Sequence, residues 1–281
     1  MFLFNRPELT ARVFAEVARA KPSKLLLIAD GPRNEQERVR CKQARKVVER
    51  IDWNCEVSHN YSDVNLGCRK CMSSGIDWVL CQVEEAILLE DDCLPDPTFF
   101  RFCSELLGRY GEDERVMMIS GDNFQRGRRR TPHSYYFSRI PHIWGWATWR
   151  RAWRHYDASL RQWPDLRDTD FLDRLFENPQ FAPAYRRIFD ETTAGHIDTW
   201  DHQWAFAFWL NNGLCVLPEV NLVTNLGFGP EATHTRNAAS PDSAIPLKPM
   251  RFPLDHPPTM LPCVEADQFT LDSIFGKRLA A

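Results

Sequence analysis

The sequence predicts an α/β fold with a mainly parallel central sheet flanked by helices. Apolar, strand-like runs alternate with helix-like segments through residues 1–125, and acidic residues follow directly after two of these runs. Alternation of this kind is typical of parallel sheets, because each crossover between neighbouring strands carries a helix. At 281 residues the chain is long enough to bury a full core.

Five strands are expected in this first half: Phe2–Phe4, Lys24–Ala29, Cys55–His59, Ala86–Leu89 and Val116–Ser120. The helices expected between them begin at Pro7, with Asn5 as the N-cap, cover Glu35–Arg50 and Cys68–Leu80, and begin again at Pro97. Only four residues precede Asn5, so the first strand is expected to be short or cut off at its start.

Residues 126–235 are expected to form the second half of the same domain. This half has longer loops and many tryptophans, and its expected helices are Trp146–His155, Phe181–Thr193 and Trp200–Asn211. Gly127–Arg130 is a basic loop, for which a solvated, mobile segment is favoured over a phosphate clamp. Residues 236–281 are rich in proline and poorly periodic, which predicts an extended tail.

Composition limits the classes of protein that fit. The net charge of −3 argues against a nucleic-acid binder, which usually carries a surplus of basic residues. The nine cysteines are scattered, which favours free thiols in a reducing compartment. No apolar run approaches the roughly 20 residues that span a bilayer, so a cytoplasmic protein is expected. The ten tryptophans fit a core better than a sugar-binding surface.

Three consecutive acids, Glu90, Asp91 and Asp92, directly follow an expected apolar strand. Ligands of open α/β sheets bind at the carboxyl ends of the strands, and adjacent carboxylates are costly to bury without a cation. Hard oxygen donors favour Mg²⁺ or Mn²⁺, which could bridge to a diphosphate. The alternative is a solvated turn in which Asp92 or Asp96 caps the next helix.

Four further residues are candidates for the same site. Asp30 ends its own strand and could contact a ribose or a base, although an Asp-Gly turn explains it equally simply. Arg6 and Arg69 lie at loop-to-helix junctions, where a nucleotide and its phosphates could bind. Asp201, flanked by aromatic residues, is either a general base or the N-cap of its helix.

Taken in order, these pieces resemble the GT-A glycosyltransferases, in particular N-acetylglucosaminyltransferase I and bacterial glycosyltransferase-family-2-like proteins. The resemblance extends from Phe2 to about Arg236. The residues that carry it are Asn5–Pro7, Ile28–Gly31, Leu88–Asp92, Pro97–Phe100, Ile119–Asn123, Trp144–Trp146, Trp200–Trp204, Leu217–Val220, Asn225–Gly229 and Thr233–His234.

The resemblance implies a GT-A, Rossmann-like fold and a role for each matching position. Asp92 is the expected metal ligand, with Asp91 and His234 beside it, while Glu90 and Asp91 would hold the donor. Arg6 and Asp30 are the expected nucleotide contacts. The wall between donor sugar and acceptor would include Trp144, Gly145, Trp146 and Trp200. Thr233 and His234 belong to a segment that can close over the diphosphate in such enzymes.

The resemblance leaves two neighbouring residues as candidates for the base. The family has two adjacent acids before the second tryptophan, whereas here Asp201 is followed by His202 and Gln203. The base is therefore Asp201 or His202. The absence of an obvious second nucleophile, together with the resemblance, favours a single displacement that inverts the anomeric configuration.

The expected function is metal-dependent transfer of a sugar from a nucleotide-diphosphate sugar to an acceptor hydroxyl, of the kind used in bacterial polysaccharide synthesis. A UDP-hexose or UDP-N-acetylhexosamine donor is favoured, by analogy with the family. The acceptor would be a carbohydrate or a lipid-linked glycan, with contact at the inner face of a membrane as one option. The rival functions are a sugar nucleotidyltransferase, a glycoside hydrolase and a non-catalytic nucleotide-sugar-binding module.

Overall fold

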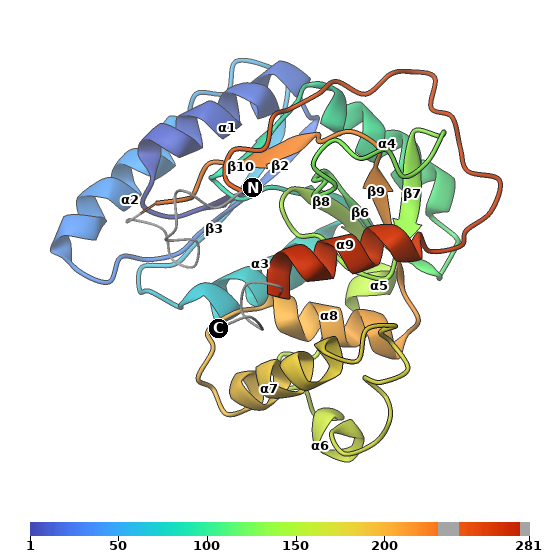
Figure 1. Ribbon diagram of the computed structural model, residues 1–281. Helices are drawn as coiled ribbons and strands as arrows, with labels where there is room; N and C mark the ends of the chain where they lie inside the picture. Colours follow the sequence, from blue (N-terminus) through green and yellow to red (C-terminus); the bar gives the residue numbers. More distant parts are fainter. Residues whose placement is uncertain (230–241, 276–281) are drawn as a thin grey trace.

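The computed structural model describes residues 1–229 and 242–275, and for Ile274 and Phe275 only the backbone. Three parallel strands form the first sheet, in the order β1 (Phe2–Leu3), β2 (Lys24–Ala29) and β3 (Glu56–Tyr61). Helices α1 (Pro7–Ala20) and α2 (Glu35–Val47) connect these strands and lie side by side on one flank (Figure 1). This arrangement confirms the expected α/β architecture of the first half.

A second sheet continues the first. Its strands follow the order β4 (Glu85–Leu88), β8 (Trp146–Trp149), β6 (Val116–Ser120), β9 (Leu214–Pro218) and β7 (Tyr135–Ser138). The end of β4 lies beside β1, because Phe2 N donates to Leu89 O at 2.8 Å and Phe2 bridges to Glu90. Only β6 and β9 pair in parallel here. The expectation of a mainly parallel sheet therefore holds for the sheet formed by β1, β2 and β3 but not for the second sheet.

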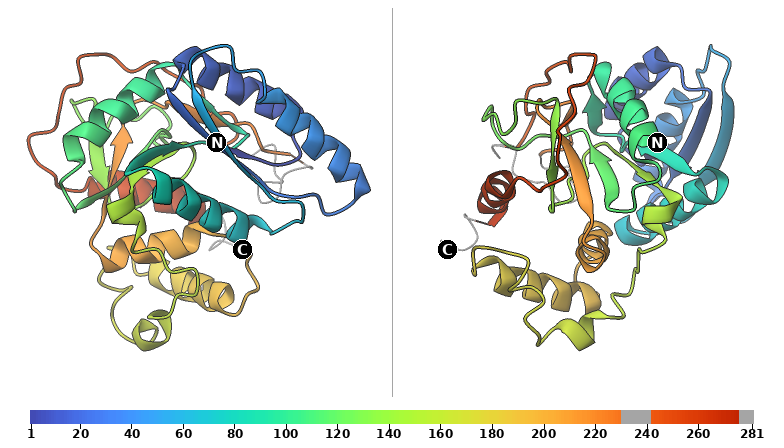
Figure 2. Two further views of the ribbon diagram at one scale, coloured as in Figure 1. Left: turned by 180° about the vertical axis from the view of Figure 1, so that it is seen from behind. Right: turned by 90° about the vertical axis from the view of Figure 1, so that its right-hand side faces the viewer.

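Helices cover both faces of the combined sheet. Helices α3 (Cys68–Gln82), α5 (Arg150–Trp153), α7 (Phe181–Thr193), α8 (Asp201–Leu210) and α9 (Val264–Phe275) contribute to one core, and α1 and α4 (Thr98–Tyr110) to the other. Strand residues alternate between the two cores, as in β2, where Leu26 and Ile28 face one side and Leu25 and Leu27 the other. Figures 1 and 2 show α7, α8 and the short α6 (Trp163–Leu166) grouped at the opposite end from α1 and α2.

The expected helix over Trp146–His155 is wrong in its first half. Trp146–Trp149 forms β8, which is hydrogen-bonded to β4 on one side and to β6 on the other. All four residues are buried, so sheet pairing satisfies backbone groups that have no access to water. Pairing with distant strands thus overrides the local pattern, and only Arg150–Trp153 is helical.

Both ends of the chain also differ from the expectation. Asn5 does not cap α1, because its side chain donates to Glu37 Oε1 at 3.0 Å and Arg6 takes the N-cap position. The C-terminal region is not wholly extended, since α9 packs against β7. Cys263 N donates to Phe137 O at 2.8 Å just before this helix begins.

Candidate active site at the carboxyl end of β4

The three acids follow β4 directly and lie at the junction of the two sheets. Asp91 and Asp92 are buried, and Glu90 is half-buried. Asp91 Oδ2 accepts a hydrogen bond from Phe4 N at 3.0 Å, which ties the cluster to the end of β1. The carboxyl ends of β1 and β4 therefore meet at this cluster, as ligand sites of open α/β sheets require.

Arg6 is the cation that faces these acids. Its Nη1 donates to Asp92 Oδ2 and lies 3.6 Å from Asp91 Oδ1, and only 17% of its side chain is exposed. Burial on its own lowers the pKa of Arg6, but the charges of Asp92 and Asp91 outweigh it, so the pKa is raised and the guanidinium stays charged. Arg6 thus belongs to the candidate site through its contacts with Asp91 and Asp92. Its expected contact with a nucleotide stays a prediction.

One guanidinium does not balance three carboxylates. Burial, followed by the charges of Asp92 and Asp91, raises the pKa of Glu90 to about 8. Burial and the charge of Asp92 raise the pKa of Asp91 to about 7, against the opposing effect of Arg6. Near neutral pH these carboxyls therefore retain protons, and a bound divalent cation would take the place of those protons and relieve the repulsion among the carboxylates.

The donor set fits Mg²⁺ or Mn²⁺ bound in part by substrate. Among the described residues the only hydrogen-bond partner of Asp92 Oδ1 is the thiol of Cys93, at 3.6 Å, so this oxygen can face a hard cation. Over the described residues no three His, Cys, Asp or Glu side chains form a ready-made metal group. Mg²⁺ sites of this type use one or two carboxylates together with substrate phosphates, so three protein ligands are not required.

Residues 223–227 pack against one side of the acid cluster. Strand β10 (Val223–Asn225) pairs with β5 (Cys93–Pro95), and Leu226 N donates to Asp92 O at 2.8 Å. A side chain at Gly227 would overlap the carboxylate of Asp92, so glycine allows the two segments to pack this closely. The expected metal ligand His234, with Thr233, lies outside the described residues.

Asp30 supports the site by holding a loop. Its carboxylate accepts from Leu66 N at 2.7 Å, Gly31 N at 2.8 Å and Asn65 Nδ2 at 2.9 Å. Burial raises its pKa, although these backbone hydrogen bonds oppose the rise. Most of its hydrogen-bonding capacity is thus used by the loop that leads into α3, which leaves less for the expected contact with a nucleotide.

Asp198 connects the two halves across the site, although no sequence motif singles it out. Its Oδ2 accepts from Cys68 N at 2.9 Å and its Oδ1 from Arg69 N at 3.1 Å, so it caps α3 from 130 residues away in sequence. The guanidinium of Arg69 itself has no hydrogen-bonded or ionic partner among the described residues. Because Asp198 lies three residues before Asp201, this cap fixes the start of α8 beside α3.

Replacing Asp198 by Ala is expected to lower the free energy of unfolding by about 1 kcal/mol, since a lost N-cap costs about 0.5–2 kcal/mol. The amides of Cys68 and Arg69 should also exchange faster with deuterated solvent. Chemical denaturation and hydrogen exchange measure the two effects. Asp63→Ala is the matched control, because Asp63 is exposed and makes no hydrogen bond within the described residues. Equal behaviour of both variants would contradict the cap.

Asp201 lies within electrostatic range of the acid cluster. Its charge contributes to the raised pKa of Glu90, and the charges of Glu90 and Asp201 both add to the effect of burial on the pKa of Cys68. The Asp201 side chain is 30% exposed and accepts a hydrogen bond from the hydroxyl of Thr199. The His202 ring lies 3.9 Å away, at the edge of ion-pair distance. Asp201 is the first residue of α8, and the N-cap position belongs to Trp200.

The expected aromatic wall is only partly at the surface. Trp146 and Trp200 are 1% and 2% exposed and stack on each other with ring centroids 5.5 Å apart, so both belong to the core. Gly145 is buried as well and has a φ of +66°. Trp144 is half-buried, and the centre of its ring lies 4.9 Å from that of Phe124 and 5.6 Å from that of Phe228. Phe124, Trp144 and Phe228 instead form a partly exposed cluster of aromatic rings, which is called the aromatic wall below.

Asp122 and His142 hold this wall in place. Both are buried, His142 Nδ1 lies 2.6 Å from Asp122 Oδ1, and Trp144 N donates to Asp122 Oδ2 at 3.1 Å. Asp122 belongs to the Ile119–Asn123 motif, which was the only sequence signal for it. Its role follows from tertiary contacts, which fix the loop that carries Trp144.

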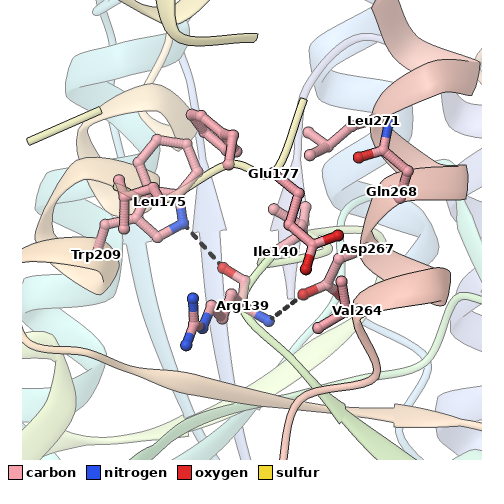
Figure 3. A pocket seen from close by; sticks show the side chains of 10 residues that line it. Arg139, Ile140, Leu175, Glu177, Trp209, Val264, Asp267, Gln268 and Leu271 are labelled. Atoms are coloured by element: carbon pink, nitrogen blue, oxygen red, sulfur yellow. Dashed lines mark hydrogen bonds between the residues drawn. The ribbon is translucent and has the colours of Figure 1, made fainter. Parts of the chain in front are cut away.

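A separate pocket lies between α8, α9 and the loop at residues 175–177 (Figure 3). Arg139 O accepts from Trp209 Nε1 at 2.9 Å and Arg139 N donates to Asp267 Oδ2 at 3.0 Å at its floor. None of the residues that line this pocket belongs to the acid cluster or to the aromatic wall. It is therefore not part of the candidate active site.

Comparisons with known proteins add little to this description. No protein-family model matches the sequence, and no curated protein matches it. One similar solved structure is a mannosyltransferase from Pyrobaculum calidifontis in complex with GDP-Man and Mn²⁺, at a TM-score of 0.36 and 12% identity. The alignment covers 62% of this chain and 45% of that chain, which is less than half its length. A structural similarity this low supports no conclusion about function. The functional interpretation therefore rests on the residues of the candidate site.

Proposed function

We propose that this chain is a metal-dependent glycosyltransferase that moves a sugar from a nucleotide-diphosphate sugar to an acceptor hydroxyl. The observation that carries the proposal is the placement of two acidic groups from different halves of the chain, which are linked by the hydrogen bonds from the start of α3 to Asp198, three residues before Asp201. Glu90, Asp91 and Asp92 end β4, and Asp201 begins α8 within electrostatic range of Glu90. The acid cluster is suited to bind the donor together with a cation, and Asp201 is suited to act as the base that deprotonates the acceptor.

The acid cluster would hold the donor. When bound, Mg²⁺ or Mn²⁺ would neutralise the diphosphate and so assist its departure. Asp92, with Asp91 beside it, would supply the protein ligands. Arg6 keeps the carboxylates of Asp91 and Asp92 in place and adds positive charge next to the phosphates. A UDP-sugar with a hexose or N-acetylhexosamine is the favoured donor.

Asp201 would serve the acceptor. It is partly exposed, and the hydroxyl of Thr199 orients its carboxylate, so one oxygen remains able to accept the proton of an acceptor hydroxyl. The acceptor oxygen then attacks the anomeric carbon opposite the leaving diphosphate, which inverts the configuration. Trp144, with Phe124 and Phe228, would support the sugar rings, because the C–H faces of sugars pack well on aromatic rings.

Binding of the donor is the first test of this proposal. A nucleotide sugar that binds the native state at a hundredfold excess over its Kd adds roughly 2.7 kcal/mol of stability, which corresponds to a rise in Tm on the order of 5 °C. We expect one nucleotide diphosphate series to give such a shift with Mn²⁺ or Mg²⁺ and to lose it with EDTA. A thermal-shift panel of nucleotide diphosphates and nucleotide sugars measures this.

Two other results would redirect the interpretation. The absence of any shift in a folded protein with metal present would count against the transferase. A shift that persists in EDTA would leave donor binding intact but remove the role of the metal. Across residues 1–229 and 242–275 no helix is long and apolar enough to cross a membrane.

A further inference from the structure

The basic loop after β6 is anchored to the protein. Gln125 is fully buried and donates through Nε2 to Ala266 O and Thr270 Oγ1 of α9, both at 3.1 Å. Its Oε1 accepts from Arg130 Nε at 2.7 Å. Arg126 and Gly127 have φ values of +52° and +81°, and Arg128 N donates to Gln125 O at 3.0 Å, which closes a tight turn. Gly127, Arg128 and Arg129 are exposed, as expected for a solvated segment, but the contacts of Gln125 hold the base of the loop to α9.

The loop gathers positive charge around one aromatic ring. The guanidinium carbons of Arg128, Arg130 and Arg126 lie 4.5, 5.4 and 6.0 Å from the ring centre of Phe269 on α9. Three like charges at one ring repel each other, although each is attracted to the ring face. An anion bound between them would relieve this repulsion.

Carboxylates balance only part of this charge. Arg126, Arg129 and Arg130 each have one carboxylate partner, at 3.1–3.3 Å, and these partners are Asp242, Glu219 and Glu265. Arg128 is exposed and pairs with no carboxylate among the residues that the structure describes. Within that part of the chain the Arg128 guanidinium contacts the ring of Phe269 and no acid, so it can bind an external anion, with the neighbouring arginines adding to the attraction.

The loop is continuous with the candidate active site. Gly227 packs on Asp92, the next residue, Phe228, contacts Trp144, and Trp144 contacts Phe124. Phe124 is followed directly by Gln125 and the basic turn. A path of partly exposed aromatic side chains therefore leads from the acid cluster to Arg128.

We propose that Arg128, with Arg126 and Arg130, binds a phosphate or diphosphate group carried by the acceptor. The identification of the ligand as an acceptor rests on the proposed function, whereas the presence of an anion site at Arg128 does not depend on that function. The sugar of such an acceptor would lie along the Phe124–Trp144–Phe228 wall, with its hydroxyl towards Asp201 and its phosphate at the basic turn. Guanidinium groups suit this task because their planar N–H donors match phosphate oxygens in pairs.

The anion site can be tested with sodium pyrophosphate in EDTA, where the acid cluster has no cation with which to bind phosphate. Isothermal titration should give saturable binding to the full chain that weakens at high salt. Arg128→Gln should weaken this binding about tenfold or more, as expected for the loss of a charge-assisted hydrogen bond. Arg174→Gln is the control, because Arg174 is also exposed and lies outside the loop, where it pairs with Asp170.

The source of the phosphate is distinguished by a second measurement. If a lipid carries the phosphate, the chain should cosediment with phosphatidylcholine vesicles that contain phosphatidylglycerol. Arg128→Gln should abolish this cosedimentation. Pyrophosphate binding without sedimentation would assign it to a soluble acceptor. Absence of pyrophosphate binding, or equal weakening by both substitutions, would overturn the site. Nucleotide binding with Mn²⁺ is measured in parallel, and its loss would concern the donor site alone.

Discussion

Replacing Asp201 by Asn is expected to reduce the rate of sugar transfer by about 10²- to 10⁴-fold, the usual contribution of a general base. Asn has nearly the same shape and can still accept the hydrogen bond from Thr199, so the fold should be unaffected. Donor affinity should stay within about twofold, because Asp201 is assigned to the acceptor. Single-turnover kinetics together with donor titration separate the two effects.

His202→Gln is the matched comparison for this prediction, since His202 is the alternative base and its ring lies 3.9 Å from Asp201. If Asp201 is the base, the His202 variant should keep most of its activity. The reverse pattern would assign the proton transfer to His202. NMR of the fresh product provides a second check, since retention of the anomeric configuration would contradict a single displacement with either base.

Asp92→Asn is expected to abolish metal-dependent donor binding. Substitution removes the negative charge that would face the cation, while the side chain keeps its size and Arg6 keeps Asp91 as an ionic neighbour at 3.6 Å. The fold should therefore persist, with some loss of stability because one partner of a buried ion pair is gone. Titration of the donor with Mn²⁺ and with EDTA measures the effect.

Glu84→Gln is the control for this substitution. Glu84 immediately precedes β4 and is also paired with an arginine, Arg150, but its side chain is 78% exposed. This variant should bind donor as the unmodified chain does. An unchanged donor titration of Asp92→Asn, with its metal dependence intact, would rule out Asp92 as a metal ligand.

The candidate site shows how far local sequence information extends. The run Glu90, Asp91 and Asp92 predicts a ligand site because it follows an apolar strand, and parallel strands bind ligands at their carboxyl ends. Their position after β4, next to the end of β1, agrees with this reasoning. The resemblance places Trp146 and Trp200 in a sugar wall, whereas in the structure they stack in the core. Tryptophan supplies a large apolar surface in either setting, and sequence does not distinguish the two.

The sequence by itself determined the α/β pattern of the first half, the position of the acid cluster and the identity of Asp201 as a candidate, because these depend on periodicity and short motifs. Only the tertiary structure decided that Trp146–Trp149 is a strand, that Asp198 caps α3 and that Gln125 anchors the basic loop to α9. Each of these depends on partners that lie from about 30 to more than 100 residues away in the chain. Hydrogen bonds between such distant groups form only once the chain has folded, and no local pattern of residues encodes them.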